Sequence, residues 1–352
     1  MARKNSRRGS RGVTIHDVAR HAGVSPMTVS RVINTENNVR EATRAKVTAA
    51  IKTLRYAPNM AARSLAGAET VRIGLLYSNP SAAYLSEFLL GSLAQSSLSG
   101  CQLVVEQCEE ASAEAIARLA AGGVHGVVLP PPLCDSAEAL EAVTRAGIAA
   151  VLVASGRPHP DFSAVSIDDF EAARTMTRHL LGLGHRRIAF INGHPNQTAS
   201  GQRFRGFVEG MTEAGLSVAT HQVAQGYFTY RSGLAAAEKL LAGSFHPTAI
   251  FASNDDMAAA AMAVAHRRGL DVPGDLMVAG FDDTPLAMAV WPSLTTVRQP
   301  ISHMARDAIL LLLTQIQGTR AEAPRQVTHR RLKHALVERE STGRAAAASG
   351  EI

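Results

Sequence analysis

The sequence predicts a small all-α domain followed by a larger α/β core of two subdomains with parallel sheets. Three observations predict this fold. A helix-turn-helix pattern, VTIHDVARHAGVSPMTVSRVIN, occupies residues 13–34. From residue 71 onward, apolar strand-like runs alternate with alanine-rich helical stretches, as in successive β-α-β units. Residues 1–67 hold 13 Lys and Arg against three acidic residues, whereas the whole chain has a net charge of only +6.

The first two helices follow from capping and periodicity. Thr14 is suited to cap a first helix, and Gly23 supplies the permissive backbone for a tight turn after it. Ser25 is an N-cap for a second helix, which begins with Pro26 at the position where a missing N–H costs nothing. That helix is expected to end near Asn34. The residues expected to face inward are Ile15, Val18, Ala19 and Ala22 in the first helix and Val29, Val32 and Ile33 in the second.

A third amphipathic helix is expected over residues 41–54, because apolar residues recur there with helical spacing. Its inward side would consist of Ala45, Val47, Ala50, Ile51 and Leu54. Pro58 ends this region, since the residue before a proline is biased away from helix. The positive charge of residues 1–67 is typical of a segment that contacts nucleic-acid phosphates. The basic residues of 1–12 are better interpreted as a solvated, disordered tail.

The core contains two series of alternating strands and helices, which imply two similar Rossmann-like subdomains with a cleft between them. The first is expected over about 71–164 and 296–325, and the second over about 165–295 and 326–343. Ligands in open α/β sheets bind beyond the carboxyl ends of the strands. No Gly-rich dinucleotide or phosphate loop appears. The helices expected in the core are a first one ending near Leu98 and those at 112–121, 136–146, 169–182, 201–214, 230–242 and 255–267.

Seven runs of this sequence resemble those of the LacI (lactose repressor) family and fall in the same order. The resemblance covers residues 13 to about 343. It implies a DNA-binding domain at 13–58, a hinge helix and linker at 59–68 and a periplasmic-binding-protein-like core at 69–343, with a disordered tail at 344–352. The runs are VTIHDVARHAGVSPMTVSRVIN, LRYAPNMAARSLAG, IDDFEAA, LGHRRIAFI, FASNDDMA, VAGFDDTPLA and SLTTVRQP.

The resemblance implies that the second helix enters the major groove of an operator. Pro26, Met27 and Arg31 match the base-reading positions of the family. Arg31 suits a bidentate contact with a guanine, worth about 1–3 kcal/mol of discrimination, and Met27 suits a thymine methyl. Pro26 offers no donor, so we expect a half-site unlike that of relatives with a polar residue there. The expected DNA-binding set also includes Thr14 and four residues suited to phosphates, Ser25, Thr28, Ser30 and Asn34.

Residues 59–66, NMAARSLA, are long enough for a helix of barely two turns, which is too short to be stable alone. In the family such a hinge helix folds on the operator, pairs with a second copy in the minor groove and wedges a leucine into the central base step. The resemblance gives that role to Leu65, with Asn59 and Ala62 also at the DNA. Hinge folding would couple DNA affinity to the geometry of the core. The alternative is an ordinary linker with one apolar residue.

A ligand pocket is expected in the cleft. Asn254 and Asp282 come at the ends of two predicted strands. By resemblance, Arg203 matches the ligand-binding arginine of the family and Phe228 its aromatic wall. An arginine and an aspartate facing one pocket can hold a vicinal diol. The other expected pocket residues are Tyr84, Phe88 and Ser155.

These pocket residues also have structural interpretations. Asp282 could cap the segment that follows it, and Asn254 could cap the next helix. Phe228 could belong to the core, and the same choice is open for Tyr84 and Phe88. The segment around Ser155 departs from many relatives, which carry an acid or an arginine there, so one sugar contact found in some relatives is in doubt.

An enzyme is not expected. Cys101, Cys108 and Cys134 lack metal-ligand spacing, and no nucleophile elbow or paired-carboxylate motif stands out. We expect no metal and no cofactor. The odd cysteine count and the absence of a signal peptide suit a cytoplasmic, nucleoid-associated protein. No apolar run approaches the length of a membrane span.

The expected function is that of an allosteric transcription repressor, released from a pseudo-palindromic DNA operator by a small-molecule effector, a sugar or sugar derivative. A homodimer is expected because one helix-turn-helix reads only half of a palindrome. One alternative is a regulator that a purine-like corepressor tightens on DNA. Another is a solute-binding protein or sugar-handling enzyme of similar fold, a class that lacks a segment like residues 13–66.

Overall fold

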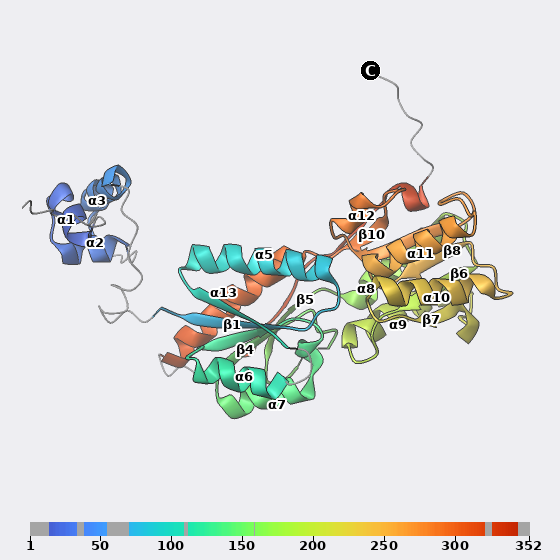
Figure 1. Cartoon of the computed structure of the whole chain (residues 1–352), viewed down its shortest axis with the longest axis horizontal. Coiled ribbons are helices and arrows are strands. Elements are labelled where there is room, and N and C mark those ends of the chain that lie inside the picture. Colours follow the sequence, from blue (N-terminus) through green and yellow to red (C-terminus); the bar gives the residue numbers. More distant parts are fainter. Residues whose placement is uncertain are drawn as a thin grey trace, which may run out of the picture. The chain divides into compact units, whose positions relative to one another are not determined.

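The structure is a computed structural model that describes residues 14–33, 39–54, 70–108, 112–157, 159–320 and 326–343. The chain divides into two compact units, residues 1–70 and 71–352, each with its own apolar core (Figure 1). Within the described ranges, no helix is long and apolar enough to cross a membrane.

The first unit is a three-helix domain of α1 (Ile15–Ala22), α2 (Pro26–Ile33) and α3 (Glu41–Leu54). Asp17 accepts hydrogen bonds from the amide and the hydroxyl of Thr14 at the start of α1, at 2.9 and 2.7 Å. Gly23 ends α1 with a φ of +66°, in the left-handed region expected of it. The Ser25 hydroxyl accepts from the Thr28 amide at 3.1 Å, so the predicted N-cap of α2 is confirmed.

The core of this domain lies between the three helices. One expected position is wrong, because Ala45 is exposed. Ala45 and Val47 differ by two residues, about 200° around the helix, so they cannot share a buried side. The buried residues are Val18, Ala19, Val29, Val32, Val47 and Ala50.

The first subdomain of the core unit is a six-stranded parallel sheet between two helical layers. Its strand order is β11-β5-β4-β3-β1-β2. Figure 1 shows α5 and α13 on one face and α6 and α7 on the other. The strands are β1 (Arg72–Tyr77), β2 (Gln102–Gln107), β3 (Gly126–Leu129), β4 (Ala149–Val153), β5 (Ser163–Ser166) and β11 (His329–Arg331). The helices are α5 (Ala82–Ser99), α6 (Ser112–Ala121), η1 (Leu133–Asp135), α7 (Ala137–Ala146) and α13 (Ile301–Arg320).

The second subdomain repeats this plan, with strand order β12-β10-β9-β8-β6-β7. All its neighbouring strands are parallel except β12, which runs antiparallel to β10. The strands are β6 (Ile188–Asn192), β7 (Val223–Gln225), β8 (Ala249–Ala252), β9 (Met277–Asp282), β10 (Thr295–Arg298) and β12 (Ala335–Val337). The helices are α8 (Asp169–Gly182), α9 (Thr198–Glu213), η2 (Thr220–Gln222), α10 (Tyr230–Ala242), α11 (Asp255–Arg267), α12 (Leu286–Ala289) and η3 (Glu340–Thr342).

The burial of the central strands explains why the alternation of apolar strands and helices is visible in the sequence. Both β3 and β8 are buried along their whole length, because helices cover both faces of each sheet and only apolar or small side chains fit there. The two predicted parallel-sheet subdomains are therefore confirmed.

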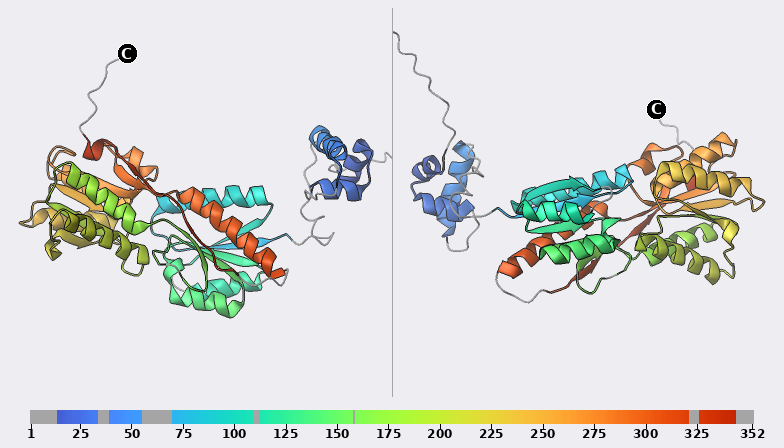
Figure 2. Two further views of the ribbon diagram at one scale, coloured as in Figure 1. Left: turned by 180° about the vertical axis from the view of Figure 1, so that it is seen from behind. Right: turned by 60° about the horizontal axis from the view of Figure 1, so that its bottom comes forward.

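The chain crosses between the subdomains three times, after β5, after β10 and after β11 (Figure 2). These crossings correct the expected subdomain boundaries. The whole of β5 lies in the first sheet and the whole of β10 in the second. The expected last boundary at residue 325 is too early, because β11 still pairs with β5 at the edge of the first sheet.

Candidate ligand-binding cleft

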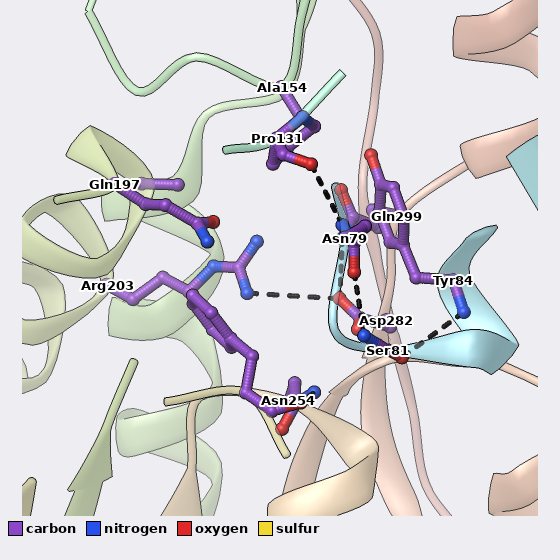
Figure 3. A pocket seen from close by; sticks show the side chains of 12 residues that line it. Asn79, Ser81, Tyr84, Pro131, Ala154, Gln197, Arg203, Asn254, Asp282 and Gln299 are labelled. Carbon is purple, nitrogen blue, oxygen red and sulfur yellow. Dashed lines mark hydrogen bonds and ion pairs between the residues drawn. The ribbon is translucent and has the colours of Figure 1, made fainter. Parts of the chain in front are cut away.

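A cavity with about 360 Å³ of empty space, counting the part open to solvent, lies between the two subdomains, where the carboxyl ends of their strands meet (Figure 3). We call it the inner cavity. Asn79, Pro131 and Ala154 follow strands of the first sheet, while Asn254 and Gln299 follow strands of the second. The full lining is Asn79, Ser81, Tyr84, Pro131, Ala154, Gln197, Ala199, Arg203, Phe228, Asn254, Asp282 and Gln299.

Arg203, on α9, is held rigidly in this cavity and is only 5% exposed. Its Nε donates to Asp169 Oδ1 at 2.8 Å, and its Nη1 donates to the Ser253 carbonyl at 2.7 Å. The guanidinium lies over the Phe281 ring, 3.7 Å from the centroid. Nη1 is 3.8 Å from Asp282 Oδ1, so the arginine and aspartate expected to share a pocket face each other.

Three buried carboxyl groups, those of Asp169, Asp255 and Asp282, lie around the cavity. Burial raises the pKa of Asp282 well above its usual range, although Arg203 acts in the opposite direction. Burial likewise raises the pKa of Asp169, and it raises that of Asp255 to about 7. One buried guanidinium therefore stands among three buried carboxyl groups whose charged forms are disfavoured by burial.

Three residues with strained backbone conformations line the inner cavity. Ala154, Phe228 and Asp282 line the cavity with φ angles of +56°, +61° and +121°, which non-glycine residues rarely adopt. Such conformations cluster at ligand sites because the surrounding structure must hold them. Gly193 makes room for the Phe228 ring, since a Cβ there would lie 2.1 Å from Cζ of that ring.

Several polar atoms around the cavity are buried without a hydrogen-bond partner among the described residues. They include the Tyr84 hydroxyl and Gln299 Oε1 in the lining, and Asp169 Oδ2 beside Arg203. Buried polar groups are nearly always satisfied in native proteins. A polar ligand that supplies hydroxyl groups would satisfy these atoms.

The structure brings five of the seven expected ligand residues to the inner cavity, namely Tyr84, Arg203, Phe228, Asn254 and Asp282. Asn254 also caps α11, where its side chain accepts from the Met257 amide at 3.0 Å. Asp282 accepts from Gln299 Nε2 at 2.5 Å.

Phe88 and Ser155 lie elsewhere. Phe88 is fully buried in the apolar core and stacks on Tyr84 with 6.3 Å between ring centroids, so it does not reach the cavity. The Ser155 hydroxyl donates to Asp135 Oδ1 at 2.7 Å, and its neighbour Ala154 lines the cavity instead. Asn79 and Gln299 went unnoticed in the sequence, although each follows a strand.

The expected DNA-facing residues of α2 lie outside the core of its domain. Met27 is 64% exposed, Ser25, Pro26 and Arg31 are exposed, and Thr28 and Ser30 are half-buried. Thr14 is exposed at the start of α1. The expected sites Asn34, Asn59, Ala62 and Leu65, and with them the hinge helix, lie outside the described residues.

Comparison with known proteins identifies two families along the chain. Residues 14–59 match the family described as "Bacterial regulatory proteins, lacI family". Residues 177–342 match a "Periplasmic binding protein-like domain".

Curated relatives match over most of the chain. Catabolite control protein A of Priestia megaterium is 34% identical over 304 residues, which cover 85% of this chain and 91% of the relative. The HTH-type transcriptional repressor PurR of Pectobacterium atrosepticum is 35% identical over 319 residues, covering 88% and 92%.

Solved structures of transcription regulators also match over most of the chain. The transcriptional regulator CelR in complex with cellobiose is 32% identical, with a TM-score of 0.72 over 94% of this chain and 99% of that one. The Lac repressor dimer bound to operator and the anti-inducer ONPF is 29% identical, with a TM-score of 0.69 over 94% and 99%.

Proposed function

The chain belongs to the LacI family of bacterial transcription regulators, and we propose that a neutral sugar or sugar derivative is the effector that releases it from its operator. Its relatives are DNA-binding regulators and not enzymes. As a family member it binds operator DNA as a dimer and responds to a small molecule. The observation that carries the sugar proposal is the facing pair of Arg203 and Asp282 in the inner cavity.

This pair suits two adjacent hydroxyl groups. One hydroxyl would accept from the Arg203 guanidinium while its neighbour donates to Asp282. The Phe228 ring, 5.8 Å from the guanidinium, offers a flat apolar wall for a sugar ring. The partnerless Tyr84 hydroxyl and Gln299 oxygen provide a further donor and acceptor.

At the DNA, we propose that α2 reads a half-site through Met27 and Arg31, and that the dimer binds a pseudo-palindrome. The segment 59–66 is proposed as a hinge helix that carries Leu65 into the minor groove. A regulator of this kind acts in the cytoplasm, and its operator binding would place it at the nucleoid.

A ligand screen with the full-length protein tests the effector class. The melting temperature is measured with neutral monosaccharides and disaccharides, sugar acids, sugar phosphates and purines. A ligand at 100 times its Kd stabilises the folded state by about 2.7 kcal/mol. We expect a shift with a neutral sugar, and the same sugar should release the protein from an operator selected in vitro. A shift with purines alone, or a sugar that tightens DNA binding, would overturn the proposal.

A further inference from the structure

Asp283 follows the cavity-lining Asp282 in the chain but is not among the residues that line the inner cavity. Its carboxylate pairs with two arginines, since Arg298 Nε lies 2.5 Å from Oδ2 and Arg339 Nη2 lies 2.6 Å from Oδ1. We propose that Asp283 is a positioning residue, which uses these two ion pairs to hold Asp282 toward the effector and to fasten it to the segments that join the subdomains. This inference rests on the proposed role of Asp282 in effector binding.

The backbone of Asp282 and Asp283 must be held by its surroundings. The two consecutive residues have φ angles of +121° and +58°. Such angles are uncommon for residues other than glycine, and they persist only where the surrounding structure fixes them. A change of either angle would move the Asp282 carboxylate relative to the Arg203 guanidinium, which it now faces at 3.8 Å (Figure 3). The geometry of the ligand-facing pair therefore depends on the contacts that fix this short segment.

Contacts of three consecutive residues fix the segment. Gln299 donates to Asp282 Oδ1 at 2.5 Å, and the Thr284 amide donates to Asp255 Oδ2 at 2.8 Å. Between them, the Asp283 carboxylate has its two cationic partners. Its side chain is only 7% exposed, so water and salt screen these ion pairs less than they screen pairs on an open surface. Charge-assisted hydrogen bonds are also stronger than neutral ones, so we expect the ion pairs to contribute strongly to holding the segment.

The two arginines lie next to places where the chain crosses between the subdomains. Arg298 is the last residue of β10, directly before the second crossing, and Gln299 follows it in that crossing. Arg339 lies two residues after β12, the strand that the chain enters after the third crossing. Its Nη1 also donates to the Leu294 carbonyl at 2.8 Å, which fixes the guanidinium. Asp283 therefore links the ligand-facing carboxylate to two of the three segments that must bend when the subdomains rotate.

Asp283→Asn separates the ion pairs from the backbone preference. Asparagine has nearly the same shape and also tolerates a positive φ, but its side chain has no charge. Without the ion pairs, Asp282 should face the cavity for a smaller fraction of the time. The apparent Kd of an effector rises in inverse proportion to that fraction, and we expect it to rise by about tenfold.

Two measurements on the full-length protein test the inference. Titration calorimetry with D-glucose, D-ribose and cellobiose gives the Kd of each sugar that binds. Hydrogen–deuterium exchange followed by mass spectrometry reports on residues 280–285 and needs no effector. Asp283→Asn should raise the Kd and should speed exchange in this segment by at least about threefold. Exchange in β8, at the centre of the same sheet, should change by less, because the effect is local.

Glu213→Gln is the matched control, since Glu213 also pairs with two arginines. Its carboxylate lies 2.7 Å from Arg178 Nε and 3.2 Å from Arg174 Nη1. Glu213 is the last residue of α9 and is not among the residues that line the cavity. The control variant should leave both the sugar Kd and the exchange of residues 280–285 unchanged.

Should Asp283→Asn fail to fold, Arg298→Gln carries the test, because the Arg298 side chain is 55% exposed. An unchanged sugar Kd, or faster exchange that extends equally to β8, would overturn the positioning role while the sugar effector stands. If the unaltered protein binds none of the three sugars, the wider ligand screen decides the sugar effector. In that case exchange alone decides the role of Asp283, and an unchanged rate in residues 280–285 would overturn it.

Discussion

The Asp135 carboxylate joins the two subdomains by accepting two hydrogen bonds from Thr198. The Thr198 amide lies 2.8 Å from Oδ2, and its hydroxyl lies 2.9 Å from Oδ1. Asp135 ends the short helix η1 of the first subdomain, and Thr198 opens α9 of the second. A further bond across the cleft runs from the Ser81 hydroxyl to Asp256 Oδ2, at 2.6 Å. Because these hydrogen bonds form only when the two subdomains are close together, they stabilise the arrangement in which the cleft is closed.

Thr198→Val should therefore weaken the effector response. The substitution keeps the shape of the side chain and removes two hydrogen bonds, one donated to Asp135 Oδ1 and one accepted from the Gly156 amide at 2.8 Å, each worth about 0.5–1.5 kcal/mol. If the effector binds the closed arrangement, its Kd should rise by about twofold to tenfold. Titration calorimetry measures this change. Thr144→Val is the control, because that hydroxyl bonds only within α7, to the Leu140 carbonyl. Equal Kd values for the two variants would contradict the role of the cross-cleft bond.

Removal of the Arg203 guanidinium should destabilise the core unit. Arg203→Leu leaves the buried Asp169 carboxylate without its cation, which typically costs about 3–5 kcal/mol. Asp169→Asn in the same chain removes the stranded charge, so the double variant should regain part of the loss. Urea unfolding followed by circular dichroism measures both free energies. If the double variant is no more stable than Arg203→Leu, lost packing and not the stranded charge explains the effect.

Stability of the core unit should fall as the pH rises from about 4 to about 7. Burial raises the pKa of Asp255 to about 7, against an ordinary value of 3.8, even though Thr284 and Thr296 donate to it. Between these values the folded chain keeps a proton that the unfolded chain has lost. The free energy of unfolding then decreases by at most about 1.4 kcal/mol per pH unit for this group.

Asp255→Asn isolates that contribution, because the amide cannot ionise. We expect the difference in unfolding free energy between the two proteins to change across this pH window and to level off above it. Urea unfolding at pH values from 4.5 to 8 measures the difference. A constant difference would contradict the raised pKa of Asp255.

The sequence predicts those helices and strands whose capping residues and apolar pattern lie within or next to the element itself. The helix at 169–182 was predicted to the residue, because Asp168 caps it and apolar residues recur along it. The strand β11 gave no such signal, since all three of its residues are exposed. It forms because the edge of the first sheet offers β5 as a partner, a contact across more than 160 residues. That is why the last subdomain boundary was misplaced.

Sequence reasoning likewise found only part of the candidate site. Asn254 and Asp282 were expected in the pocket because ligands lie beyond strand ends. The same rule applies to Asn79 and Gln299, which were not predicted. Gln197 is the N-cap of α9 and lies five residues beyond the end of β6, so a search confined to the residues next to a strand end misses it. Phe88 lies one helical turn after Tyr84 on α5, so both share one side of the helix. Only the tertiary structure shows that the cavity ends between them.

Met27 and Arg31 lie four residues apart on α2, so their side chains occupy one face of the helix. Arg31→Ala should relax operator specificity at one base pair, where the preference is worth about 1–3 kcal/mol. Binding to every single-base variant of a selected operator measures that preference. Arg20→Ala is the comparison, because Arg20 is exposed on α1 beside Asp17 and outside α2. It should leave the base preferences unchanged. An equal loss of affinity on all operators for Arg31→Ala would place that side chain at phosphates, because backbone contacts carry no sequence preference.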